Sequence, residues 1–296
     1  MCKSAIKSLQ LSVYILITML TLACGKNNST QWNNASELSK KTQLSAPERI
    51  KQLTDQIDGS VPYAELYEER CKLLMAENRY AEAKGDAKNA LSLKPENPYY
   101  FFLVAQTHKK LGEADSALVA ARTAEDKGYQ TEELYTLTGR CYLIFRKYNL
   151  AIEYFDKALK KSPFYAPAYH FKGLAFAELR DTTKAISTMQ TAIEQQPEYA
   201  DAYNSLVSIY MNRKEMVLAE QTILSALRFS PDDPYSLYNL GLILQRKQMP
   251  DSAAFFFRKA IYHKPDFYQA HFNLGMHAFA NNDFMEAADY FEKAQN

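Results

Sequence analysis

From about residue 64 onward the sequence repeats with a period of 34 residues, and this period restricts the possible folds more than any other feature. Two columns of the repeat hold alanine in every unit. The first column is Ala83, Ala117, Ala151, Ala185, Ala219, Ala253 and Ala287. The second column is Ala90, Ala124, Ala158, Ala192, Ala226, Ala260 and Ala294. A chain with such a period forms one small unit of secondary structure many times and stacks the copies on one another.

The columns predict that each unit is a pair of antiparallel helices. Alanine fits where two helices cross closely, because a larger side chain would hold them apart. Proline recurs after the second helix of the unit, where a residue without an N–H group ends a helix. The prolines are Pro95, Pro163, Pro197, Pro231 and Pro265. In the second unit Tyr129 occupies the corresponding position.

A third column is small for the same reason, and a column of mostly aromatic residues flanks it. The small residues are Cys71, Ala105, Gly139, Gly173, Val207, Gly241 and Gly275. The bulky residues are Tyr67, Phe101, Tyr135, Tyr169, Tyr203, Leu237 and His271. A large residue in one helix beside a small residue in its neighbour lets the two pack closely.

Residues 132–165 form the most regular unit, and their pattern resembles the tetratricopeptide repeat. The residues that carry the resemblance are Tyr135, Gly139, Tyr142, Ala151, Phe155, Ala158 and Pro163. The resemblance implies an all-α fold, an α-solenoid of about seven helix-turn-helix units. The expected units are 64–97, 98–131, 132–165, 166–199, 200–233, 234–267 and 268–296. The first two units depart from the pattern at Leu74, Ala87, His108 and Ala121.

The N-terminal 23 residues are typical of an export signal. Lys3 and Lys7 precede an apolar run of about 15 residues, which is shorter than the roughly 20 residues that span a bilayer. Ala23 and Cys24 at its end resemble the lipobox of bacterial lipoproteins, although Thr21 replaces the usual aliphatic residue. The resemblance implies that Cys24 is acylated and becomes the new N-terminus. An ordinary signal peptide with a chance cysteine and an uncleaved anchor stay open as alternatives.

Two further segments precede the repeats. Residues 24–44 are polar and predict a flexible tether between lipid and domain. Residues 45–63 predict an N-terminal capping helix, because Ser45, Pro47 and Glu48 form a helix start. Gly25 after the cysteine is not the aspartate that the lipoprotein family often uses for inner-membrane retention. The expected location is therefore the cell envelope, and the periplasmic face of the outer membrane is favoured over the inner membrane, which stays open.

The sequence contains no pattern of catalytic residues, and we expect no enzyme activity, no cofactor and no metal. Its formal net charge is +1, with 35 basic and 34 acidic residues, so no basic excess indicates nucleic acid. Cys71 and Cys141 lack zinc spacing, and they occupy helix positions expected to be buried, so we expect them to pack. Three triplets resemble an O-glycan acceptor sequence, although Asp, Ser and Thr also cap helices. They begin at Asp115, Asp181 and Asp251.

The family resemblance implies a concave groove lined by the first helix of each unit. On that helix, residues separated by four and seven positions share one face. The predicted partner-binding residues are Tyr235, Tyr238, Leu242, Phe272, Met276, Phe279, His170 and Leu174. A secondary charged wall comprises Lys72, Lys109 and Arg140. Packing of some of these residues against an adjacent helix, and self-association through the apolar end, stay open.

These observations together predict a non-catalytic protein–protein interaction scaffold, anchored by lipid in the bacterial envelope, that assists assembly or recruitment of an envelope complex. The alternative is a regulatory adaptor that binds and titrates a single soluble periplasmic partner. One column of the predicted groove face contains no lysine. Its residues are Glu68, Phe102, Thr136, His170, Asn204, Tyr238 and Phe272. Capture of a C-terminal carboxylate, as in the chaperone-binding members of the family, is therefore not expected.

Overall fold

The computed structural model describes residues 44–295, and all of its secondary structure is helical. The predicted signal peptide, nearly all of the tether and the lipidation site Cys24 lie outside the described residues. Among helices α3 to α17, none combines the length and the apolar character that crossing a membrane requires. The described chain divides after Arg79 into two compact units, and each is described by itself.

The first unit consists of α3 (Ala46–Gly59) and α4 (Ala64–Ala76). Ser45 and Glu48 form the predicted helix start, since the Ser45 amide donates to the Glu48 carboxylate at 2.9 Å. Leu53 and Ile57 of α3 pack against Leu66 of α4. Helix α3 thus covers one face of α4.

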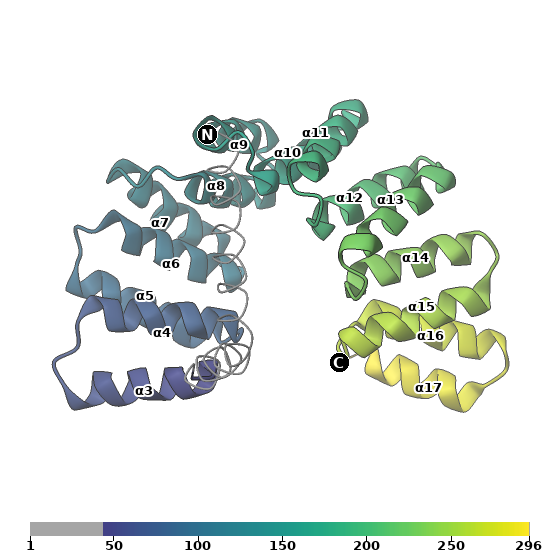
Figure 1. The fold of residues 1–296 in the computed structure, drawn as a ribbon, viewed down its shortest axis with the longest axis horizontal. Coiled ribbons are helices and arrows are strands. Elements are labelled where there is room, and N and C mark those ends of the chain that lie inside the picture. The colour runs from purple at the N-terminus through teal and green to yellow at the C-terminus, as the bar shows by residue number, and fades with distance from the viewer. Residues whose placement is uncertain (1–43, 296) are drawn as a thin grey trace, which may run out of the picture. The chain divides into compact units, whose positions relative to one another are not determined.

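The second unit is a series of helical hairpins (Figure 1). Its first helices are α6 (Pro98–Lys110), α8 (Glu132–Ile144), α10 (Ala166–Glu178), α12 (Ala200–Asn212), α14 (Pro234–Arg246) and α16 (Tyr268–Ala280). Its second helices are α5 (Tyr80–Leu93), α7 (Ala114–Asp126), α9 (Tyr148–Lys161), α11 (Thr182–Gln195), α13 (Met216–Phe229), α15 (Pro250–His263) and α17 (Phe284–Lys293). Each first helix packs on its own second helix and on the second helix before it. This arrangement confirms the predicted α-solenoid.

The two alanine columns lie where the helices meet. Every alanine of the first column is at most 2% exposed, and so is every alanine of the second column up to Ala260. Ala294, at the end of α17, is partly exposed. Alanine occupies these positions because the neighbouring helices leave no room for a larger side chain.

The glycine column is small because an aromatic ring fills the space beside it. A Cβ atom on Gly139 would lie 2.5 Å from Cε1 of Phe155, and one on Gly241 would lie 2.5 Å from Cε1 of Phe257. Real Cβ atoms do not approach so closely. The ring comes from the second helix of the same repeat, so each glycine seats the phenylalanine of its own hairpin.

The turn within each hairpin needs one residue with a left-handed backbone. In the hairpins of the second unit this residue is Gly112, Arg146, Arg180, Lys214, Gln248 and Asn282, with φ between 55° and 76°. Asn78, near the end of the first unit, has a φ of 59°. The next residue donates its amide back across the turn, as Lys147 does to the Tyr142 carbonyl at 2.9 Å. These bonds satisfy carbonyl groups at the end of the first helix. Only Gly112 belongs to the residue type that adopts this conformation without strain.

A different device ends α7, where the proline lattice is interrupted. Gly128 has a φ of 94°, and the amide of Tyr129 donates to the Ala124 carbonyl at 2.9 Å. A glycine C-cap therefore ends this helix without proline. The ring of Tyr129 then stacks on Phe102 with centroids 5.0 Å apart.

We expect Gly241→Val to lower the free energy of unfolding by about 1–3 kcal/mol, because the added methyl groups must displace the Phe257 ring. Phe257→Ile alone should also destabilise, because it leaves a cavity. The double variant recreates Val207 and Ile223 of the preceding repeat. The loss in free energy of unfolding of the double variant should be about 1 kcal/mol smaller than the sum of the two single losses. Urea unfolding followed by circular dichroism measures these differences.

The matched control is Gly85→Ala in α5, where an added Cβ meets nothing within 4 Å. This substitution should raise the free energy of unfolding by about 0.5–1 kcal/mol, since alanine is the better helix former. Additive costs for the pair at positions 241 and 257 would contradict a shared space.

We expect Lys214→Gly to stabilise the protein by about 0.5–1 kcal/mol, because glycine has no Cβ to strain the left-handed turn. Lys214 is exposed, so the change removes little packing. Gly112→Ala tests the same turn in reverse and should destabilise. Thermal unfolding of both variants checks the prediction, and a lower midpoint for Lys214→Gly would contradict it.

Candidate partner-binding surface

Hydrogen bonds join successive first helices at matching positions along the predicted groove face. The fifth residue of one first helix bonds to the sixth residue of the next. His170 Nε2 lies 2.8 Å from Ser205 Oγ. Asn239 Nδ2 donates to Asn204 Oδ1 at 2.8 Å, and Asn273 Nδ2 donates to the Tyr238 hydroxyl at 3.2 Å. We call this series the inter-repeat ladder.

The residue just before each new first helix covers the ladder from one end. Tyr199 brings its hydroxyl within 3.1 Å of His170 Nδ1. The ring of Phe267 lies 4.9 Å from that of Tyr238, centroid to centroid. Part of the predicted groove face is therefore occupied by the neighbouring repeat.

Four of the predicted partner-binding residues take part in these contacts between repeats. His170 is 4% exposed, and burial together with the positive charge of Arg140 lowers the pKa of its imidazole to about 4. The ring is therefore neutral near pH 7. Leu174, Tyr238 and Leu242 are partly buried against the apolar core of α11 to α16. Their role toward a partner stays a prediction.

The other four predicted residues are exposed. The exposed fractions are 47% for Tyr235, 51% for Phe272, 46% for Met276 and 54% for Phe279. Tyr235 belongs to α14, whereas the other three follow one face of α16. The predicted set thus separates into an isolated tyrosine and an apolar face at the last first helix.

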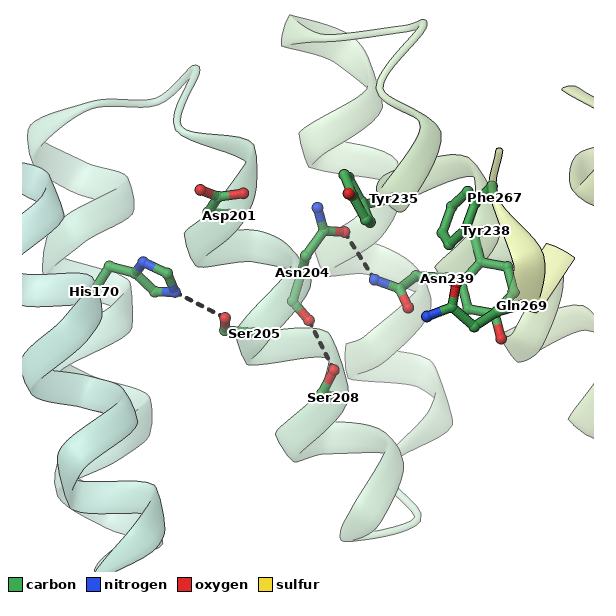
Figure 2. A pocket seen from close by; sticks show the side chains of 10 residues that line it. All are labelled: His170, Asp201, Asn204, Ser205, Ser208, Tyr235, Tyr238, Asn239, Phe267 and Gln269. Carbon is green, nitrogen blue, oxygen red and sulfur yellow. Dashed lines mark hydrogen bonds between the residues drawn. The ribbon is translucent and has the colours of Figure 1, made fainter. Parts of the chain in front are cut away.

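A hollow of about 330 Å³ opens beside Tyr235 (Figure 2). It is lined by His170 of α10, by Asp201, Asn204, Ser205 and Ser208 of α12, by Tyr235, Tyr238 and Asn239 of α14, and by Phe267 and Gln269. Most of these side chains are polar. The hollow therefore offers carboxylate, amide and hydroxyl groups within reach of one exposed aromatic ring.

Several lining residues do not belong to the face that the sequence pattern identifies. Ser205 and Asn239 lie one position away from it on their helices, whereas Asp201 holds the helix position that Tyr235 has in the next unit. The available signal is the sixth position of the first helix, which is Ser205, Asn239 and Asn273 in three successive units. Burial and the nearby charge of Asp233 raise the pKa of Asp201.

Two residues of the predicted charged wall, Lys109 and Arg140, belong to the second unit. Lys109 and Arg140 lie close enough to repel, and burial followed by the charge of Arg140 lowers the pKa of Lys109 to about 8. The guanidinium carbon of Arg140 lies 4.1 Å from the centroid of the Phe171 ring. Lys72 belongs to the first unit and pairs with Glu68 at 2.6 Å.

A sequence model of the tetratricopeptide repeat matches residues 102–166, 172–234 and 238–296, more than half of the chain. The chain belongs to the tetratricopeptide repeat (TPR) family. It is therefore a non-catalytic scaffold whose repeats bind protein partners. No curated protein matches the sequence significantly.

Solved structures share this TPR fold. A tetratricopeptide repeat protein from Parabacteroides merdae ATCC 43184 is 17% identical, with a TM-score of 0.67 over 83% of this chain and 96% of that one. PilW, a type IV pilus biogenesis factor, is 18% identical, with a TM-score of 0.58 over 68% of this chain and 94% of that one.

A third similar structure comes from the APC/C hetero-tetramer Cut9–Hcn1, at 18% identity and a TM-score of 0.63. The match covers 79% of this chain and 46% of that one, so this TPR chain spans about half of its length. At such identities the likeness shows the fold alone.

The remaining side chains of chemical interest in the TPR units are buried or dispersed. Among residues 44–295, no three His, Cys, Asp or Glu side chains lie together as a metal site would require. Cys71 and Cys141 are free and buried. Burial raises the pKa of the Cys141 thiol to about 11, so the thiol is protonated at neutral pH and packs as a small apolar side chain.

Proposed function

We propose that this TPR protein is an envelope scaffold that holds an extended segment of a partner protein in the hollow beside Tyr235. The observation that carries the proposal is the composition of that hollow. Each residue of an extended peptide presents one N–H and one C=O group. The carboxylate of Asp201 accepts hydrogen bonds, whereas the amides of Asn239 and Gln269 both donate and accept them.

Tyr235 supplies the aromatic anchor of the proposed site. Its ring is 47% exposed, but Phe267 supports it at a centroid distance of 5.1 Å and Lys264 Nζ lies 5.6 Å from its centroid. A tyrosine held in one place covers much area at low entropic cost, which is why tyrosines often dominate binding energy. The site therefore combines polar groups for a peptide backbone with one fixed ring for a side chain.

We also propose that the chain is attached to a bacterial membrane through acyl chains on Cys24. The support is the order of the sequence: an apolar run, then Ala23 and Cys24, then a polar segment up to residue 44. Gly25 favours the outer membrane, with the repeats on the periplasmic side. A tethered array of this kind would bring its partner to the membrane surface as part of an envelope complex.

Site-specific photo-crosslinking tests the hollow. We expect a photoreactive residue at Ser208, which lines the hollow, to capture the partner from intact cells. The same residue at Ser187, exposed on the second helix α11, should not capture it. Several envelope proteins among the products support a scaffold, whereas one soluble protein supports the adaptor. Equal capture from both positions would contradict the proposed site.

Tyr235→Ala should weaken capture of that partner at least tenfold, as expected for an anchor worth about 1.4 kcal/mol or more. Tyr262→Ala is the matched control, because Tyr262 is 81% exposed on α15 and does not line the hollow. Circular dichroism verifies that both variants keep their helical content. Equal loss in the two variants would place the partner elsewhere.

We expect Cys24→Ala to abolish incorporation of labelled fatty acid and to release the protein from the membrane fraction, because two acyl chains are needed for stable anchoring. Cys2→Ala is the control and should keep both the label and the membrane attachment, since Cys2 precedes the proposed cleavage point. Firm membrane binding of the Cys24→Ala variant would contradict the lipid anchor.

A further inference from the structure

The apolar face of α16 occupies the positions through which earlier repeats contact the next repeat. Phe272 is the fifth residue of its helix and so corresponds to His170, Asn204 and Tyr238 of the inter-repeat ladder. Each of those residues is bonded to the following first helix. Among the described residues no helix follows α17, and Phe272 is 51% exposed.

Three more apolar side chains extend this surface. Met276 and Phe279 follow Phe272 on α16, and Phe284 of α17 lies against Phe279 with ring centroids 5.5 Å apart. The exposed fractions of these three range from 46% to 58%. We call Phe272, Met276, Phe279 and Phe284 the terminal face. It contains no charged residue, and contiguous exposed apolar surfaces of this kind mark contact sites.

The first unit treats its terminal helix differently. Leu53 of α3 is fully buried against Leu66 of α4, with Tyr67 and Leu73 packed beside them. An ion pair between Arg49 and Glu69 at 2.6 Å closes the edge of this contact. That face of α4 is therefore already occupied within its own chain and is closed to a second molecule.

We propose that the terminal face binds the terminal face of a second copy of this chain and forms a closed pair. The equivalent positions of earlier repeats are covered by another repeat of the same type, so a repeat is the shape that fits. Two identical faces without charge meet without like-charge repulsion. A head-to-tail contact would need the face of α4 that α3 covers, whereas a contact between like faces closes after two copies.

This pairing uses α16 and α17 and does not depend on the proposed function of the hollow. Its failure would leave capture from Ser208 unaffected, and failure of the hollow would leave pairing unaffected. The two proposals can therefore be tested in the same full-length protein.

Co-capture of two differently tagged full-length copies from the same cells tests the pair. We expect each tag to recover the other, and Phe279→Glu to reduce recovery at least tenfold by placing like charges opposite each other. Met276→Lys should act in the same way and serves as a second variant. Phe255→Glu is the matched control, because Phe255 is 52% exposed on α15, away from the terminal face. Circular dichroism verifies the fold of each variant.

Cross-linking in intact membranes then tests closure. Met276→Cys provides an exposed thiol, since Cys71 and Cys141 are buried. The parent chain without this substitution is the control for cross-linking through Cys2 or Cys24. A bismaleimide should convert this variant to a dimer and to nothing larger. Absence of co-capture, equal loss with Phe255→Glu, products larger than a dimer, or cross-linking of Met276→Cys to a different protein would each overturn the proposal.

Discussion

The whole array depends on how closely the two helices of one repeat approach each other. Glycine at positions such as 139 and 241 lets a phenylalanine ring lie directly against the opposite helix, and that ring is almost completely buried. In the second repeat Ala105 stands at the glycine position and Ala121 at the ring position. There Tyr100 is 1% exposed at the place where the third repeat carries Leu134 and the later repeats carry alanine or serine. The interior is therefore filled in each of these repeats, although the residues that fill it differ.

Because the hairpins are alike, every junction between them presents the same two positions to each other. The ladder from His170 to Asn273 is the polar result, and the exposed aromatic face of α16 is what the same positions become when no repeat covers them within the described chain. Surfaces available for binding are thus those that stacking leaves uncovered. The hollow beside Tyr235 and the terminal face arise from one packing rule applied at two places.

Much of this architecture could be predicted from the sequence, because alanine and proline columns report helix crossings and helix ends directly. The left-handed turns could not. Lys214 and Gln248 adopt that conformation because of backbone hydrogen bonds, and their residue types do not predict it. The hollow was only partly predictable, since Ser205 and Asn239 lie one residue from the helix face that the repeat pattern identifies. Partial burial of Tyr238 depends on Phe267, which belongs to the connection before the next helix.

The spacing of the inter-repeat ladder has an evolutionary consequence. Each bond joins only adjacent modules, so removing residues 200–233 in frame would bring Asn239 opposite His170 with Tyr199 still beside it. An amide and an imidazole are again a compatible pair. Whole modules can therefore be gained or lost by unequal recombination without redesign of the junctions. Array length, and with it the reach of the protein, can change faster in a lineage than the chemistry of any single module.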